Sequence, residues 1–426
     1  MTVPDLPTLA SSKRLRLAAI LLVYLVEGAL FALLLTSVPV FMAARGDTPG
    51  AIALVTGLAV SPMLAKPVFG LLVDRFSYRP MGRYRAAIVA SLVASLAALI
   101  LAAALVSDLS STPILAGVAL CVSIPLTVLD VAMDGTAVDL LSDDERARAA
   151  GMMYGGQSIG YAAVVALHGR MIAVWGISSA FLLSALCVAL VLGFFMLVRE
   201  RSGERLLPWM AGEAVASEPG ELLKSWCQEI KQGIRGVLVM ANLLFLPLLM
   251  IRQAPLAASE ILNPGIALAA GWTTADFTDT VATGALAASL LGFLAFGTVV
   301  DRLGSREILT FSLVALAVSC ALFALAADHW SQSWVIAAMV FAIPSLTFLL
   351  SIATMRHIIS MCQARNGAMQ FAIFAAISNL GQPLGAAIAG SAGGDGNEVL
   401  AYWTLAALMC AGAVWNMFRP QLRCRG

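Results

Sequence analysis

The chain has 426 residues, of which 60% are hydrophobic and 12% are charged, whereas about 25% of the residues of a typical soluble domain are charged. Its formal net charge is +1, and its basic residues gather at the ends of apolar segments rather than along one face, which argues against a nucleic-acid-binding surface. The composition therefore predicts a membrane protein that crosses the bilayer many times.

Apolar segments near 20 residues long predict twelve transmembrane helices. The first six cover residues 17–43, 50–73, 86–107, 113–138, 148–172 and 176–198, and the others cover residues 236–258, 275–300, 307–327, 333–355, 366–390 and 398–418. The first segment is too long for the apolar part of a signal peptide, so we expect it to remain as a helix. The predicted fold class is an all-α membrane protein with two six-helix bundles.

The longest polar stretch separates the two sets of helices. We therefore expect an N-terminal bundle over residues 1–198, a linker over residues 199–235 and a C-terminal bundle over residues 236–426. Within the linker, apolar residues recur at helical spacing opposite charged ones, which predicts an amphipathic helix at the cytoplasmic surface. This helix either tethers the bundles or binds a regulatory partner.

Basic residues set the expected orientation. Most of the 26 Lys and Arg residues fall at the termini and in the even-numbered loops, and the positive-inside rule then places both termini in the cytoplasm. We expect a multi-pass protein of the inner (plasma) membrane, surrounded by lipid and monomeric.

Two short motifs occur twice along the chain. One occurs as Gly70-x-x-x-Asp74-Arg75 and Gly297-x-x-x-Asp301-Arg302, each time where an apolar segment gives way to arginines. The other occurs as Gly156-Gln157-x-x-Gly160 and Gly381-Gln382-x-x-Gly385. These repeats predict two pseudo-symmetric copies of one bundle, an arrangement in which many secondary transporters place a central site between the halves.

The first motif, continued by Arg83, resembles the loop 2–3 signature of the major facilitator superfamily. The resemblance implies that fold, and a gate that holds the cytoplasmic side closed in the outward-facing state. Glycine allows close helix approach, while aspartate and arginine can form hydrogen bonds and ion pairs. We expect Asp139, near the end of the fourth helix, to pair with these arginines. The alternative is that the basic loops only set the topology.

We assign five charged residues to the membrane interior, and each costs roughly 2.5 kcal/mol or more at the centre of a bilayer. They are Glu27, Lys66, Asp130, Asp134 and Arg252. Charges at that depth usually face a cavity. The resemblance implies that helices 1, 4, 7 and 10 line the cavity, and all of these charges except Lys66 lie on those helices.

Asp130 and Asp134 lie four residues apart, hence on one helix face about 5–6 Å apart at Cβ. Two carboxylates this close in a poorly solvated place cannot both ionise cheaply. We therefore predict that they take up and release a proton, or bind substrate. The alternative is that they pair with the loop arginines as part of the gate. Lys66 either neutralises an acid of helix 4 or extends toward the cytoplasm.

Glu27 and Arg252 lie 225 residues apart, close to the repeat interval, and so occupy near-equivalent positions in helices 1 and 7. We predict that these opposite charges meet across the cavity and either bind a zwitterionic or anionic substrate or report protonation. Otherwise each is a charge on the cavity wall. Gln157 and Gln382, from the second repeated motif, are further candidate binding residues.

Other kinds of chemistry find no support in the sequence. There is no phosphate-binding glycine loop, no Cys/His metal spacing and no nucleophile paired with a base, so we predict no enzyme, no metal site and no cofactor. The seven cysteines include no Cys-x-x-Cys pair and are interpreted as small hydrophobic residues.

The first half of the chain carries a finer resemblance. The stretch from Leu129 to Leu141, with its three aspartates, resembles the superfamily branch that holds AmpG-like muropeptide permeases, acetyl-CoA transporters and siderophore importers, and Lys66-Pro67 through Arg75 is also similar. The resemblance implies transport of a small organic solute, with a muropeptide, a siderophore and a similar smaller solute left as alternatives.

We therefore expect a secondary active transporter that moves its solute by alternating access, coupled to protons by symport. One alternative is a multidrug or metabolite efflux antiporter, whose proton would use the same acids. Another is a non-transporting scaffold of the same fold that binds pigment or assists assembly.

Overall fold

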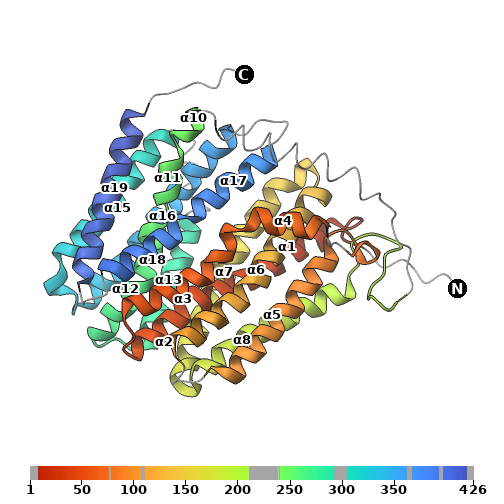
Figure 1. The fold of residues 1–426 in the computed structure, drawn as a ribbon, viewed down its shortest axis with the longest axis horizontal. Helices are drawn as coiled ribbons and strands as arrows, with labels where there is room; N and C mark the ends of the chain where they lie inside the picture. Colours follow the sequence, from red (N-terminus) through yellow and green to blue (C-terminus); the bar gives the residue numbers. More distant parts are fainter. Residues whose placement is uncertain are drawn as a thin grey trace. The chain divides into compact units, whose positions relative to one another are not determined.

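The computed structural model describes residues 8–75, 78–106, 111–210, 238, 240–291, 305–361, 367–392 and 397–419, whose regular elements are all helices (Figure 1). The chain divides into two compact units. Unit 1 comprises Met1–Val38 and Ala65–Ser217, and unit 2 comprises Pro39–Leu64 and Glu218–Gly426. The predicted domain boundaries stay a prediction, while the structure groups residues 39–64 with unit 2.

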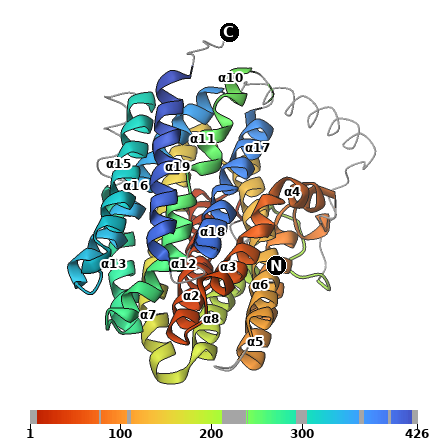
Figure 2. The same cartoon turned by 60° about the vertical axis from the view of Figure 1, so that its left-hand side comes forward.

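Unit 1 is built from long helices. They are α1 (Lys13–Ala32), a π-helical turn (Leu33–Ser37), α4 (Lys66–Arg75), a 3-10 turn (Arg79–Met81), α5 (Arg85–Leu105), α6 (Thr112–Leu140), α7 (Asp143–Trp175) and α8 (Ile177–Leu197). The helix α2 (Val38–Ala44) follows the π-helical turn directly in the chain, and all of it except Val38 belongs to unit 2. Helices α5 and α8 lie side by side in both views (Figure 1 and Figure 2).

Unit 2 contains more and shorter helices. They are α3 (Pro49–Leu64), α10 (Met240–Leu243), α11 (Leu246–Ile251), α12 (Ala254–Ala269), α13 (Thr274–Leu291), α15 (Ser305–Leu325), a 3-10 turn (Ala327–His329), α16 (Ser333–Met361), α17 (Gly367–Asn379), α18 (Gly381–Ala392) and α19 (Glu398–Phe418). Helices α15 and α19 lie side by side (Figure 2) and enclose a hydrophobic core with α11 and α16, which includes Phe245, Leu313, Leu350 and Met409.

The predicted fold class is confirmed. Each of the twelve predicted segments corresponds to one helix or to a run of short helices, and within the described part of the chain nine helices are long and apolar enough to cross a membrane. Several segments predicted as continuous are interrupted, however. Helix 2 breaks at Ala65, because Pro67 has no N–H group with which to bond the preceding turn. Helix 1 widens into the π-helical turn, and helix 11 breaks at Leu380.

Helix 7 ends later than predicted. The expected end at residue 258 is wrong, since α12 continues to Ala269. Asn263, which is polar, and Pro264, which breaks helices, are both buried in α12. The hydroxyl of Tyr402 donates a hydrogen bond to the Asn263 side chain, which satisfies it inside the unit. Glu260 therefore lies within α12 rather than in a loop.

Repeated glycines bring helices together in each unit. A Cβ atom added to Gly160 of α7 would lie 2.0 Å from the carbonyl oxygen of Leu25 in α1, and one on Gly28 would lie 1.9 Å from that of Gln157. In unit 2, a Cβ on Gly385 of α18 would lie 2.3 Å from the carbonyl oxygen of Ala254. Only glycine permits these approaches, so the repeated Gly-Gln motif sets the same local packing in both units.

Two arginines of the repeated loop regions also have matching roles. Arg85 is fully buried and donates hydrogen bonds of 2.8 Å and 2.7 Å to the carbonyl oxygens of Phe195 and Leu206, just inside and beyond the end of α8. Arg306 donates to the carbonyl oxygens of Asn416 and Met417 at the end of α19, at 3.0 Å and 2.9 Å. The last carbonyl groups of a helix lack partners and carry partial negative charge, so both arginines stabilise helix ends.

An ion pair joins the starts of α1 and α7. Arg16 donates to both carboxylate oxygens of Glu145 at 2.9 Å, and the same guanidinium donates to the carbonyl oxygen of Leu9 at 2.7 Å. Burial raises the pKa of the Glu145 carboxyl, but the hydrogen bonds and charge of Arg16 outweigh it and hold that pKa below its usual range. The pair thus fixes the register of the two helices that the glycines bring together.

We predict that Gly160→Ala lowers the free energy of unfolding by about 1–3 kcal/mol, because the new methyl group would overlap the backbone of α1. Thermal unfolding of the purified protein in detergent measures the effect. The matched control is Gly155→Ala on the same helix, where an added Cβ meets nothing within 4 Å. Equal melting temperatures for the two variants would contradict the proposed close packing.

Candidate functional site

Four of the five charges predicted to lie within the membrane come from unit 1 and gather in one cluster. Glu27 comes from α1, Lys66 from α4, and Asp130 and Asp134 from α6. Glu27 and Asp130 are each only 3% exposed. Charged groups this deeply buried require partners or protons, so their contacts show how the cluster is balanced.

Lys66 balances one of the acids. Its ammonium group contacts Oδ2 of Asp130 in an ion pair, in which the Asp130 side chain is 4% exposed and that of Lys66 is 26% exposed. Of the two predicted alternatives for Lys66, the structure places it against an acid of helix 4. The break at Ala65 directly precedes Lys66, which is therefore the first residue of α4. From this position its side chain contacts α6.

Tyr24 links the two aspartates and was missed by the sequence analysis. Its hydroxyl lies 2.7 Å from Oδ1 of Asp134 and 3.4 Å from Oδ1 of Asp130. Tyr24 precedes Glu27 by three residues, which places both on one face of α1. This spacing could have identified Tyr24 from the sequence. A buried tyrosine hydroxyl usually has a hydrogen-bond partner, and a tyrosine three residues before an intramembrane acid lies on the same helix face as that acid.

Glu27 completes the cluster and leaves it with unbalanced charge. Its side chain forms a hydrogen bond with Gln157 of α7, while Oε2 is buried without a hydrogen-bond partner among the described residues. Three carboxyl groups therefore share one lysine. If all three are ionised, two negative charges remain uncompensated, one on the buried Glu27 and one on the exposed Asp134, so the cluster is suited to bind protons or a cationic group.

The predicted gate residues are described only in part. Arg83 lies 3.5 Å from one oxygen of Asp139, and Arg201, which was not predicted, donates a 2.6 Å hydrogen bond to the other. A Cβ on Gly70 would meet Val131 at an ordinary 3.8 Å, so among the described residues no contact requires glycine at this position, and its role in the gate stays a prediction. The side chains of Asp74 and Arg75, and all of Gly297, Asp301 and Arg302, lie outside the described residues.

Unit 2 holds Arg252 in a polar setting. Nε of Arg252 donates a 2.8 Å hydrogen bond to the hydroxyl of Ser378, and its guanidinium also contacts the hydroxyl of Ser351. Next to it, the amide of Gln382 donates to that of Gln253 at 2.6 Å. Thus Gln157 contacts helix 1 in unit 1, and Gln382 contacts helix 7 in unit 2. Glu27 and Arg252 belong to different units, and their pairing stays a prediction.

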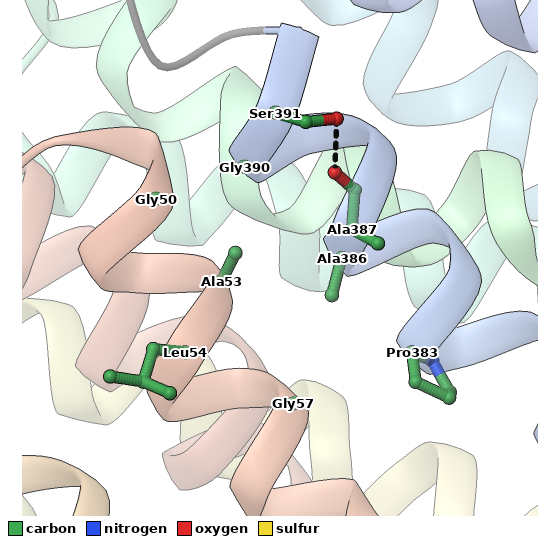
Figure 3. Close-up of a pocket in the computed structure, with 9 residues that line it drawn as sticks. All are labelled: Gly50, Ala53, Leu54, Gly57, Pro383, Ala386, Ala387, Gly390 and Ser391. Atoms are coloured by element: carbon green, nitrogen blue, oxygen red, sulfur yellow. Dashed lines mark hydrogen bonds between the residues drawn. The ribbon is translucent and has the colours of Figure 1, made fainter.

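A groove between α3 and α18 of unit 2 is apolar. It has a volume of about 370 Å³ and is lined mainly by glycine, alanine and proline, with Ala53 and Ala386 pointing toward the gap between the helices (Figure 3). Ser391 is the one hydroxyl in the lining, and it donates to the carbonyl oxygen of Ala387 on its own helix. No charged side chain lines the groove, so it is a seam of small residues that permits close helix packing rather than the predicted charged site.

Comparison with known proteins agrees with this architecture. Residues 20–258, more than half of the chain, match the family model of the Major Facilitator Superfamily. The chain therefore belongs to the major facilitator superfamily. It is a multi-pass membrane protein and a secondary transporter rather than an enzyme. No curated protein sequence matches the chain.

Solved structures show the same fold at low sequence identity. Two structures of the nucleoside transporter NupG, one of them a variant, are each 12% identical to the chain, with TM-scores of 0.67 and 0.69. They cover 95% and 94% of this chain and 100% and 98% of their own. A POT family transporter in complex with 5-aminolevulinic acid is 12% identical with a TM-score of 0.68, covering 94% of each chain.

We predict that Lys66→Met lowers the free energy of unfolding by about 3–5 kcal/mol, because it leaves the buried Asp130 without its counter-charge. The double variant Lys66→Met with Asp130→Asn removes both charges and is expected to regain most of the loss. Thermal unfolding measures both variants.

The control is a matching single and double variant of the Arg45–Asp47 ion pair, whose side chains are 23% and 22% exposed. Because Asp47 is more exposed than Asp130, this ion pair should contribute no more than about 1 kcal/mol to the free energy of unfolding. Equal stability of the single and double Lys66 variants would show that the ion pair does not hold α4 against α6.

Proposed function

We propose that this transporter moves a small organic solute by alternating access and couples that movement to protons through the acid cluster of unit 1. The observation that carries the proposal is the charge count: Glu27, Asp130 and Asp134 share the single ammonium group of Lys66. A cluster with more carboxylates than cations, in which Glu27 and Asp130 are buried and Asp134 is exposed, gains stability when it takes up a proton. Release of that proton requires access to water, which alternating access supplies.

The contacts support different tasks for the three acids. Asp130 is paired with Lys66, so its charge is already balanced. Asp134 accepts a hydrogen bond from Tyr24 and has no cation within the contacts described, while Glu27 keeps one carboxylate oxygen without a partner. We therefore place the exchangeable protons on Asp134 and Glu27, and give Asp130 and Lys66 the task of holding α6 and α4 together.

The break in helix 2 connects this chemistry to movement. Lys66 directly follows the break at Ala65, and Ala65 is also the point at which unit 1 resumes after residues 39–64. A change of charge in the cluster alters the attraction on Lys66 and so acts at a position where the helix is already interrupted. Asp139, bound by Arg83 and Arg201, is proposed as part of the cytoplasmic gate.

The solute class is proposed from charge and resemblance. Arg252, held by Ser351 and Ser378, offers a site for an anionic group, and Glu27 offers one for a cation or a proton. The AmpG-like resemblance favours a muropeptide, a siderophore or a similar solute, and one structural neighbour is described with the zwitterion 5-aminolevulinic acid. We further propose an inner-membrane location, cytoplasmic termini and a monomeric carrier.

We predict that a transported solute moves protons into or out of proteoliposomes, and that Asp134→Asn and Glu27→Gln each abolish this movement. A pH-sensitive dye in the lumen reports it. Solutes are first selected by thermal shift from amino sugars, muropeptides, siderophores, acyl-CoA, amino acids and 5-aminolevulinic acid.

Asp328→Asn, which removes an exposed carboxylate from a turn of unit 2, is the matched control and should transport as the native protein does. Solute accumulation that persists unchanged when the pH gradient is collapsed would rule out proton coupling. Unchanged proton movement in both acid variants would rule out the cluster as its site.

A further inference from the structure

Helix 1 is interrupted by the π-helical turn at Leu33–Ser37. There the N–H group of Val38 donates to the carbonyl oxygen of Leu33, five residues earlier rather than four. Pro39 follows and has no N–H group with which to bond the carbonyl group of Leu35. The regular hydrogen bonding of helix 1 is therefore lost at this point. The proposed proton chemistry uses none of these residues.

A buried histidine holds the end of this turn. The hydroxyl of Ser37 donates to the carbonyl oxygen of Ala32 at 2.9 Å. A hydroxyl has a single hydrogen, so the Ser37 oxygen accepts the 2.8 Å hydrogen bond from Nδ1 of His168. In the neutral imidazole Nε2 is then the acceptor, and the hydroxyl of Ser184 in α8 donates to it at 3.2 Å. All three residues are fully buried, so the histidine joins helix 1 to α8 inside unit 1.

A second hydrogen bond reaches the turn from the same helix as His168. The hydroxyl of Thr36 bonds the hydroxyl of Tyr161 in α7. Tyr161 and His168 are seven residues apart, about two turns of α7, so they lie on one face of that helix. This face therefore presents two polar groups to two consecutive residues of the turn. We call Thr36, Ser37, Tyr161, His168 and Ser184 the clasp.

The clasp lies where the chain leaves unit 1. The division between the units falls between Val38 and Pro39, one residue after the turn. All members of the clasp belong to unit 1, whereas residues 39–64 are grouped with unit 2. Sharp bends of helices occur mainly at prolines and at π-helical turns, and both are present here. The turn is thus held on its unit 1 side and able to bend on the other.

We propose that the π-helical turn is the hinge at which helix 1 bends during transport, and that His168 is the positioning residue that holds this hinge against α7 and α8. His168 acts through Ser37, whose hydroxyl it keeps directed at the carbonyl group of Ala32. Without the histidine, bending would no longer be confined to the turn. The inference rests on the proposed alternating access and identifies where helix 1 yields.

Hydrogen exchange of the full-length protein in detergent, read by mass spectrometry, tests the clasp. His168→Leu removes the hydrogen bonds of the ring and should raise amide exchange in residues 33–44 by at least about tenfold. His168→Asn should restore most of the native protection, because its side-chain amide can donate to Ser37 in place of Nδ1. The matched control is Ser123→Ala, which alters another fully buried serine whose hydroxyl donates within its own helix, and it should leave residues 33–44 unchanged.

Two results of this experiment would overturn the proposal. One is native exchange of residues 33–44 in His168→Leu. The other is an increase that spreads equally over α5, because a general loss of core packing would explain it. If His168→Leu does not fold, Ser37→Ala takes its place, since it removes only one hydroxyl and should raise exchange in the same residues.

A distance measurement tests the bending itself. Nitroxide labels are placed at Ala44→Cys in α2 and Val174→Cys in α7, two exposed positions, in a background in which the seven native cysteines are replaced. Double electron–electron resonance should give a narrow distance distribution when His168 is present and a broader one in His168→Leu. His168→Asn should narrow it again. Identical distributions in all three proteins would show that His168 does not position the hinge.

Neither measurement needs a solute, which separates this inference from the proposed function. If the clasp variants behave as expected while no solute moves protons, the hinge stands and proton coupling is wrong. If proton-coupled transport is observed while His168→Leu keeps native exchange and distances, transport stands and the hinge is wrong.

Discussion

The ion pair between Lys66 and Asp130 is the contact on which the candidate site of unit 1 depends. A lone lysine or aspartate buried at this depth would be strongly destabilising, but each balances the other. The pair joins α4 to α6 immediately after a helix break, and it leaves Asp134 and Glu27 as the acids without a cation. Tyr24 and Gln157 then hold these acids by hydrogen bonds from α1 and α7. The same arrangement thus provides local stability and unbalanced charge.

The two units share features of their helix packing but differ in the charged residues that their helices carry. Gly160 in unit 1 and Gly385 in unit 2 allow equivalent helices to approach at backbone distance, and Arg85 and Arg306 stabilise equivalent helix ends. The polar residues on that scaffold differ. Unit 1 carries acids with one lysine, whereas helix 7 of unit 2 carries Arg252 and Glu260.

Two helix interruptions coincide with the divisions between the two units. Helix 1 contains a π-helical turn at Leu33–Ser37, and the division between the two units follows it directly, between Val38 and Pro39. The second division lies between Leu64 and Ala65, at the break in helix 2. The π-helical turn is stabilised by side chains, since the hydroxyl of Ser37 bonds the buried His168 at 2.8 Å. Such turns are frequent at functional sites because they weaken the regular hydrogen bonding of a helix.

The sequence alone determined the helical class, the approximate position of twelve membrane segments and the repeat, because the transfer of apolar side chains into a bilayer is a local property of each segment. It also identified Glu27, Lys66, Asp130 and Asp134 as costly residues. Only the tertiary structure decided that Lys66 meets Asp130, that Tyr24 joins the two aspartates, and that helix 7 continues past Glu260. These outcomes depend on contacts such as that between Tyr24 and Asp134, 110 residues apart, and on buried partners such as Tyr402 for Asn263. No periodicity or composition within a single segment encodes which distant side chain will satisfy a buried polar group.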